Sequence, residues 1–288
     1  MRFSFIDAEK AHYPITMLCR VLKVSRAGFY AWFGRPPSPR AVEDARLTVL
    51  VREAHERGRR NYGSPRIHKD LIAHEVFVSR KRVIRLMQAE KIVGRQRRRY
   101  RSTTMSEHNQ PVAPNILAQD FQATEPNQKW VGDTTELITS EGRIYLAAIV
   151  DLFSRFVVGW ALSASNNRHL TLKALEMALH RRGPKGYLVH HSDQGSTYAA
   201  DDYQRVLDAS GITCSMSRRG NCYDNAAMES WFSTLKSELG ERFETHGKAK
   251  EKLFDYIEVF YNQQRTHSAI GYVSPAEFER TFTERQAA

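Results

Sequence analysis

Residues 129–162 read KWVGDTTELITSEGRIYLAAIVDLFSRFVVGWAL. Three segments of this stretch are rich in β-branched and aromatic residues, and turn-like residues separate them. The pattern predicts three consecutive strands, at Lys129–Leu137, Ile144–Val150 and Phe156–Leu162. An aspartate, Asp133, lies within the first strand, where a carboxylate is costly unless it is paired or bound to a metal ion. We therefore expect Asp133 to be paired or metal-bound.

Helices and strands alternate in the chain that follows. Apolar spacing and turn residues predict a helix at Arg168–Arg181, a strand at Tyr187–His191, a helix at Ala199–Ala209, a strand at Ile212–Met216 and then a helix that carries Glu229. Three strands, helix, strand, helix, strand, helix is the order of a ribonuclease-H-like fold. We therefore expect an α/β fold with a mixed five-stranded sheet flanked by helices.

Three carboxylates stand in this predicted fold, each in a different element. Asp133 lies within a strand, Asp193 follows a strand, and Glu229 lies on a helix, with 35 residues between the last two. Such acids can converge on one point and hold two divalent cations about 3.5–4 Å apart. Lys236 lies two helical turns after Glu229 on the same side, where it could hold a phosphate. The alternatives are a tight turn before Gly195 for Asp193 and an exposed helix residue for Glu229.

Other polar residues favour structural roles. Asp151 ends a predicted strand before a hairpin connection, so we interpret it as structural. His190 and His191 have no second His/Cys pair at zinc-ligand spacing, which argues against a zinc site. The three cysteines form no Cys-x-x-Cys pair, which argues against a disulfide framework and favours a reducing cytosol. They are Cys19, Cys214 and Cys222.

Charge divides the chain into two parts. The net charge is +11, but residues 1–110 carry 24 Lys/Arg against 10 Asp/Glu, and the remainder carries 19 against 22. This asymmetry is typical of a protein that binds a polyanion such as double-stranded DNA. The alternative is a basic surface that only aids solubility. No apolar stretch approaches the ~18 residues that span a membrane, and the N-terminus shows no secretory signal.

The basic third is predicted to be helical. Pro14 can open a helix and Ser25 can cap the next one, which together form a short helix-turn-helix. Residues 36–39, Pro-Pro-Ser-Pro, read as a linker, because proline cannot continue a helix. A helix is expected from about Val42 to Ala54, another after the turn at 61–65, and a third capped by Ser79. The second helix of such a motif can enter a major groove.

Two groups of cations are candidates for DNA contact. One group faces outward on the predicted helix after Ser79, and the other packs five arginines into seven residues, for which a solvated linker is the alternative. The first comprises Arg80, Lys81, Arg82 and Arg85, and the second comprises Arg95, Arg97, Arg98, Arg99 and Arg101.

The three acids, their 35-residue interval and Lys236 resemble the DDE catalytic core shared by retroviral integrases and bacterial transposases. More closely, the chain resembles the second-frame product (OrfB) of insertion sequences whose transposase is encoded in two overlapping frames. The matching segments are Pro14–Trp32, Tyr62–His68, Val78–Val83, Trp130–Thr135, Asp151–Trp160, His191–Tyr198, Gly220–Lys236 and Tyr261–His267.

The resemblance implies a function and its partners. It implies cleavage at element ends followed by strand transfer, with two Mg²⁺ (or Mn²⁺) ions held by Asp133, Asp193 and Glu229. The implied partners are element-end and target DNA, the upstream-frame protein as a fusion or complex, and further copies of the chain on DNA. The implied location is the bacterial cytoplasm, in association with the nucleoid.

Five regions follow from these predictions. They are a short helix-turn-helix segment at 1–38, a helix-turn-helix-like DNA-binding domain at 40–94, a basic and polar linker at 95–125, the catalytic core at 126–240 and a helical extension at 241–288. Two alternatives share the same elements. One is a non-catalytic DNA-binding regulator made by the element, and the other is a ribonuclease-H-like nuclease, which would not need two helix-turn-helix modules.

Overall fold

The structure, a computed structural model, describes residues 1–95, 111–218 and 221–287. Its first three helices are α1 (Arg2–Glu9), α2 (Ile15–Val21) and α3 (Arg26–Phe33). The predicted cap of α3 is confirmed, since the Ser25 hydroxyl accepts a hydrogen bond from the Gly28 amide at 3.0 Å. Helix α1 was not predicted, and it completes a small core with the other two. The core residues are Ile6, Leu18, Cys19 and Phe29.

A second group of helices follows, comprising α4 (Pro39–Arg57), α5 (Ser64–Ala73) and α6 (Arg80–Ala89). The assignment of Pro39 to a linker was wrong. Pro39 is the first residue of α4, and the Ser38 hydroxyl caps the helix. The first amides of a helix have no acceptor within the helix, so proline is tolerated there.

The sheet contains β1 (Lys129–Thr139), β2 (Gly142–Asp151), β3 (Val157–Ser163), β4 (Leu188–Ser192) and β5 (Ile212–Met216). The strands lie in the order β3-β2-β1-β4-β5. Strand β1 runs antiparallel to β2 and parallel to β4. The predicted mixed five-stranded sheet is therefore confirmed.

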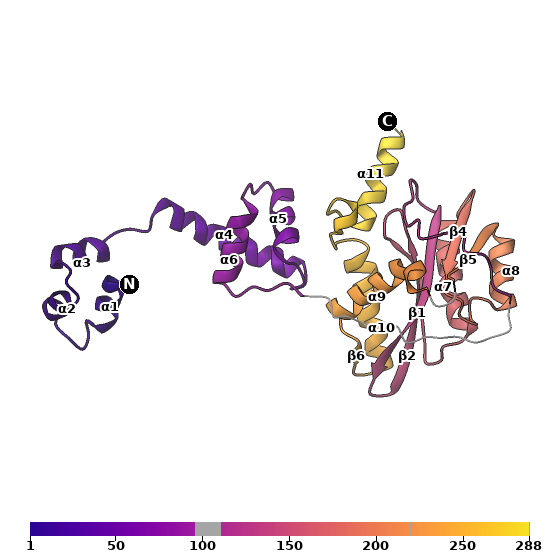
Figure 1. Ribbon diagram of the computed structural model, residues 1–288, viewed down its shortest axis with the longest axis horizontal. Coiled ribbons are helices and arrows are strands. Elements are labelled where there is room, and N and C mark those ends of the chain that lie inside the picture. The colour runs from indigo at the N-terminus through magenta and orange to yellow at the C-terminus, as the bar shows by residue number, and fades with distance from the viewer. Residues whose placement is uncertain (96–110, 219–220, 288) are drawn as a thin grey trace.

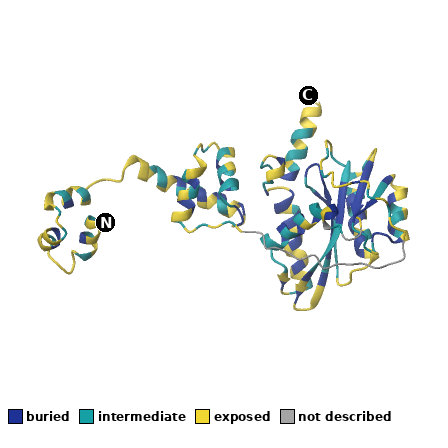
Figure 2. Cartoon of the chain, in the orientation of Figure 1, coloured by how far each residue is buried: buried dark blue, intermediate teal, exposed yellow. Residues whose placement is uncertain are grey.

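Helices cover both faces of the sheet (Figure 1). Helix α7 (Arg168–Arg182) packs on β2 and β3, and α8 (Asp201–Ala209) lies against β5. Helix α9 (Ala226–Glu238) packs against β1. Its buried apolar residues belong to one large cluster, and those of α7 and α8 belong to another. The strands between these layers are the most buried part of the fold (Figure 2). Gly159 allows the approach of α7, because a Cβ there would lie 2.1 Å from the carbonyl oxygen of Ala174.

The C-terminal region is helical with one exception. Its helices are α10 (His246–Phe254), a π-helix (Asp255–Tyr261), a short 3₁₀-helix (Ser268–Ile270) and α11 (Pro275–Ala287). The exception is β6 (Arg242–Phe243), which pairs in parallel with the far end of β1 and adds a sixth strand. A two-residue strand carries too little pattern to be predicted from sequence.

The α4–α6 module contacts the C-terminal region. The Tyr62 hydroxyl accepts a hydrogen bond from the Thr266 amide at 2.8 Å, and Arg59 forms an ion pair with Asp255. Apolar residues of α4–α6 belong to the same buried cluster as α9 and the π-helix. The module is thus packed against the side of the core that carries α9. In the part of the chain that the structure describes, no helix is long and apolar enough to cross a membrane.

Candidate active site

The register of the sheet places the first two acids at the same level. Val131 of β1 pairs in parallel with His191 of β4, and Asp133 and Asp193 each lie two residues further along. Neighbouring strands lie about 4.8 Å apart, so these two positions are adjacent at one edge of the fold. The electrostatics agree with this placement. Burial raises the pKa of Asp133 well above its usual value, and the carboxylate of Asp193 raises it further.

The Asp133 carboxylate accepts two hydrogen bonds, and both come from neutral donors. Its Oδ1 accepts a hydrogen bond from the Thr134 amide at 2.7 Å, and its Oδ2 accepts one from Asn225 Nδ2 at 2.8 Å. The Asp193 Oδ1 accepts from the Gly195 amide at 2.9 Å. The turn that we considered as an alternative for Asp193 is therefore present, and it aims the residue at the end of β4.

Glu229 lies in the first turn of α9 and is exposed. Partial burial raises its pKa, and its charge contributes a smaller increase to the pKa of Asp133. Glu229 is therefore within electrostatic reach of the other acids. Within 1–95, 111–218 and 221–287, no three His, Cys, Asp or Glu side chains are gathered closely enough to hold a metal ion. Three like charges repel one another, and the sharing of metal ions by all three acids stays a prediction.

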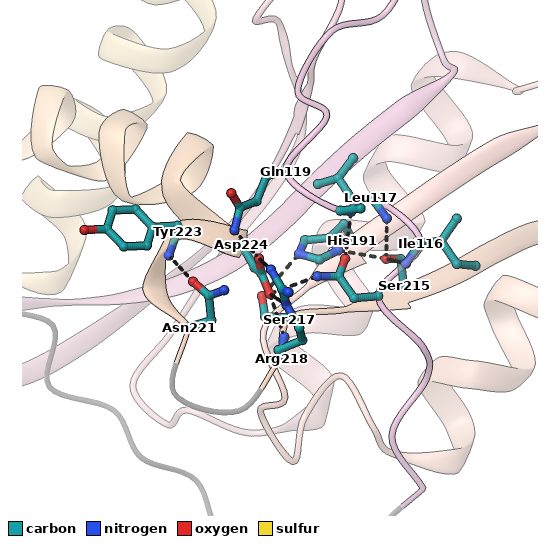
Figure 3. A network of polar contacts seen from close by, with 12 residues as sticks. Ile116, Leu117, Gln119, His191, Ser215, Ser217, Arg218, Asn221, Tyr223 and Asp224 are labelled. Atoms are coloured by element: carbon teal, nitrogen blue, oxygen red, sulfur yellow. Dashed lines mark hydrogen bonds and ion pairs between the residues drawn. The ribbon is translucent and has the colours of Figure 1, made fainter.

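A buried acid just before α9 anchors the start of that helix. The Asp224 carboxylate is fully buried and accepts hydrogen bonds from Asn115, from Gln119 and from both the backbone and the guanidinium of Arg218 (Figure 3). These donors hold its pKa well below the usual value, with Arg218 the largest influence. Asp224 and Asn225 belong to the 3₁₀-helix Cys222–Asn225 that leads into α9. The anchor thus fixes the position from which Asn225 reaches Asp133.

The two histidines before Asp193 have structural contacts. His191 Nδ1 lies 2.8 Å from the Ser215 hydroxyl, and its Nε2 lies 3.2 Å from the Ser217 hydroxyl (Figure 3). His190 Nε2 lies 3.1 Å from the Tyr203 hydroxyl. Burial lowers the pKa of His191 to about 4 and that of His190 to about 3, so both are neutral at pH 7.

Asp151 also has the structural contacts that its sequence context predicted. Its two carboxylate oxygens accept hydrogen bonds from the backbone amides of Asn127 and Phe153, at 2.8 and 2.9 Å. Burial raises its pKa to about 6. The residue therefore organises the end of β2 rather than the acid site.

The cations of α6 differ in what they contact. Arg80 and Lys81 are exposed at the start of the helix. Arg82 and Arg85 form ion pairs with Asp44 of α4, at 2.7 and 2.6 Å. The prediction that all four face outward holds for Arg80, Lys81 and Arg85, but it was wrong for Arg82, which is half-buried against Asp44 of α4, a contact that helical periodicity cannot show.

The remaining predicted DNA contacts lie near the end of α9 or outside the described residues. Arg95 donates to the backbone carbonyls of Ser237 and Glu238, both at 3.0 Å. Lys236 is half-buried, and burial lowers its pKa while the carboxylates of Glu241 and Glu136 oppose that change. Arg97, Arg98, Arg99 and Arg101 lie outside the described residues.

Comparison with known proteins decides the family. Two family models, each described as an integrase core domain, match residues 123–222 and 210–275, and one described as an HTH-like domain matches residues 42–100. The chain is 38% identical over 283 residues to transposase InsF for insertion sequence IS3A of Escherichia coli (strain K12), covering 97% of this chain and 98% of that protein. The chain belongs to the IS3 family of transposases.

The chain is also similar to two further proteins. It is 44% identical over 272 residues to an insertion element IS600 uncharacterized 31 kDa protein of Shigella sonnei, covering 94% of this chain and all of that protein. A solved HTLV-2 integrase catalytic core domain in complex with magnesium is 17% identical with a TM-score of 0.44, covering 55% of this chain and 99% of that one.

The family membership confirms the central predictions from sequence. As an IS3-family transposase with an integrase catalytic core, the protein is a DDE polynucleotidyl transferase of DNA transposition, and it binds DNA. The HTH-like match, residues 42–100, spans most of α4 and all of α5 and α6, the region in which the sequence predicted three helices. Sequence reasoning missed Asn225 and Asp224, although both stand beside Glu229 in the segment that carries the family resemblance.

Proposed function

We propose that this IS3-family transposase cleaves element ends and transfers the strands through Asp133, Asp193 and Glu229, which together hold two Mg²⁺ (or Mn²⁺) ions. The observation that supports it most directly is that Asp133 and Asp193 each lie two residues beyond the paired residues Val131 and His191, at one level of the sheet. The Asp193 carboxylate raises the pKa of Asp133, so the two acids need a positive partner to remain charged together. A divalent cation satisfies that need.

The residues present fit a magnesium site. The donors are carboxylate and amide oxygens, the hard ligands that Mg²⁺ prefers. Asp133 lies within β1, Asp193 is held by its turn, and Glu229 lies in the first turn of α9, close enough for its charge to raise the pKa of Asp133. Ions bound there would activate a water or a 3′-hydroxyl and stabilise the leaving oxygen. The protein's own part is to orient the carboxylates and to hold the DNA strand against them.

DNA contacts would come from two surfaces. Lys236, half-buried two turns after Glu229, would hold the phosphate backbone near the scissile bond. Arg80 and Lys81 lie at the N-terminus of α6, where phosphates are also favoured by the helix dipole. Arg82 and Arg85 would contribute less, because Asp44 already contacts both. Arg95 would link the module to the core, and the arginines at 97–101 would add phosphate contacts.

The proposal extends to organisation and partners. We infer that residues 1–38, 40–94, 95–125, 126–240 and 241–288 act as the five regions predicted from sequence. The active species would be a fusion or complex with the upstream-frame protein, assembled as an oligomer on nucleoid DNA in the bacterial cytoplasm. The net positive charge of residues 1–110 supports binding to the polyanion.

The test compares two isosteric substitutions in the fused protein with element-end DNA and Mg²⁺. Asp193→Asn removes one proposed ligand, so strand cleavage and joining should fall by orders of magnitude while end binding persists. Asp208→Asn, at an exposed position on α8, removes the same charge away from the site and should leave strand joining at the parent rate. Normal strand joining by the Asp193→Asn protein would overturn the assignment of the acids.

A further inference from the structure

Asn225 is a buried amide with one half satisfied. It is 7% exposed, and its Nδ2 donates to Asp133 Oδ2 at 2.8 Å. Its Oδ1 is buried and accepts no hydrogen bond from the residues that the structure describes. Buried carbonyl oxygens in folded proteins nearly always have a donor. The unpaired oxygen therefore points to a ligand, and it belongs to the same amide group that contacts the first acid.

Helix capping does not explain this side chain. Asn225 occupies the N-cap position of α9, where asparagine normally uses Oδ1 to accept an amide of the first turn. Asn167 does this at the start of α7, accepting from the Leu170 amide at 3.3 Å. Asn225 makes no side-chain cap hydrogen bond. The same residue type at the same helix position is therefore used differently beside the acids.

The position of Asn225 is fixed by the residue that precedes it and by the helix that follows it. The preceding residue, Asp224, is held by Arg218, Gln119 and Asn115, so the backbone at this point is anchored. Glu229 follows Asn225 by four residues, in the first turn of α9. Asn225 thus contacts the acid of the strand from the start of the helix that carries the third acid.

We propose that Asn225 is a positioning residue of the acid site, in which Nδ2 orients Asp133 and Oδ1 faces a hydrated divalent cation. This inference rests on the proposed metal-dependent function and adds a specific role to it. The donor half of the amide holds Oδ2 of Asp133 while the Thr134 amide holds Oδ1, and together they orient the carboxylate. The acceptor half offers an oxygen, which suits either the ion or a water molecule that the ion holds.

The test measures binding of Mn²⁺ alone to the full chain by electron paramagnetic resonance, with no DNA and no turnover. Asn225→Ala removes both halves of the amide, and we expect Mn²⁺ affinity to fall by about tenfold or more, as for other residues that orient metal ligands. Asn225→Gln keeps both the amide donor and the amide oxygen, so it should retain more of the parent affinity than Asn225→Ala does. Asn167→Ala, which removes a capping asparagine far from the acids, should bind Mn²⁺ as the parent does.

The outcomes separate this inference from the proposed function. If Asn225→Ala binds Mn²⁺ as tightly as the parent while Asp193→Asn does not, the role of Asn225 is wrong and the acid site stands. If Asn225→Gln binds Mn²⁺ no more tightly than Asn225→Ala, the amide group has no role at the acid site, and the inference is again overturned. If Asp193→Asn also retains full affinity, the metal site itself is wrong. Thermal unfolding of each variant identifies any that does not fold, and the comparison then rests on the variant that does.

Discussion

Two aspartates near the start of α9 are treated by the fold in opposite ways. Asp224 is fully buried, yet it accepts hydrogen bonds from two side-chain amides, a backbone amide and a guanidinium, and its pKa is held well below the usual value. Asp133 is half-buried and accepts from two neutral donors, while Asp193 and Glu229 add like charge and its pKa is raised.

The two environments distinguish a charge that stabilises the fold, at Asp224, from a charge that serves the function, at Asp133. The interactions of Asp224 favour its ionised form, as expected of a structural anchor. The surroundings of Asp133 disfavour ionisation, and strongly perturbed carboxyl groups of this kind gather at functional sites. Substitution of Asp133 should therefore mainly lower activity, whereas substitution of Asp224 should mainly lower the stability of the fold.

The largest expected effect is on catalysis at Asp133. Asp133→Asn in the fused protein should lower strand joining by at least about 100-fold, the upper range for removing a residue that only orients a metal ligand. Its melting temperature without divalent cation should rise, because a like-charge contact with Asp193 is relieved. Strand-transfer assays and thermal unfolding measure the two changes. A variant that is both active and less stable would contradict this view of Asp133.

The effect at Asp224 should be mainly on stability. Asp224→Asn removes the charge that Arg218 and the amides surround, and the loss of hydrogen bonds to a charged group should reduce the free energy of unfolding by about 2–3 kcal/mol. Asp120→Asn is a suitable control, because Asp120 is exposed and contacts only Lys129 among charged partners in the described part of the chain. Urea denaturation measures both. Equal stability of the two variants would show that the Asp224 network is not an anchor.

His191, beside the Asp224 network, should make stability depend on pH. Its folded-state pKa is lowered to about 4 from an ordinary value of 6.5, so protonation favours the unfolded chain. This contribution is present above pH 6.5 and is lost as the pH falls towards 4. From pH 7 to pH 5 it should amount to about 2 kcal/mol. His191→Gln should lose less stability over that interval than the parent, by urea denaturation at each pH. An identical loss would exclude His191 as the titrating group.

The smallest expected effect concerns a surface acid, Asp44. Asp44→Asn releases Arg82 and Arg85, so binding of the chain to random-sequence duplex should strengthen about two- to threefold, and the log–log slope against salt should steepen by up to about 0.9 per added phosphate contact. Glu43→Gln on the same helix releases Arg46 instead and serves as the control. Fluorescence anisotropy across a salt series measures both. Unchanged binding in Asp44→Asn would mean that α6 does not approach the phosphates.

Sequence reasoning succeeded where structure follows local rules. The strands around Asp133, the helix that carries Glu229 and the caps at Ser25 and Ser79 depend on residue periodicity and on neighbours within one turn. The family resemblance then supplied the function, which the comparisons confirm.

What the sequence could not predict depends on contacts between distant residues. The bond between Asn115 and Asp224 joins positions 109 residues apart, and that between Asn225 and Asp133 joins positions 92 apart. No local pattern marks either pair. Pro39 was misjudged for a different reason, because its role depends on Ser38 being a cap, which a proline-rich segment obscures.

The position of Asp133 within β1 has a consequence for backbone dynamics. Asp133 pairs with Ala148 in the middle of a long antiparallel ladder, and β4 pairs with the start of the same strand. Amide hydrogens there should exchange with solvent only on large-scale unfolding. The first amides of α9, those that precede Glu229, have no acceptor within the helix and should exchange far faster. A divalent cation should therefore slow amide hydrogen exchange at the start of α9 and leave exchange in the middle of β1 unchanged. Ion binding would then be detected by hydrogen exchange at the helix and not at the strand.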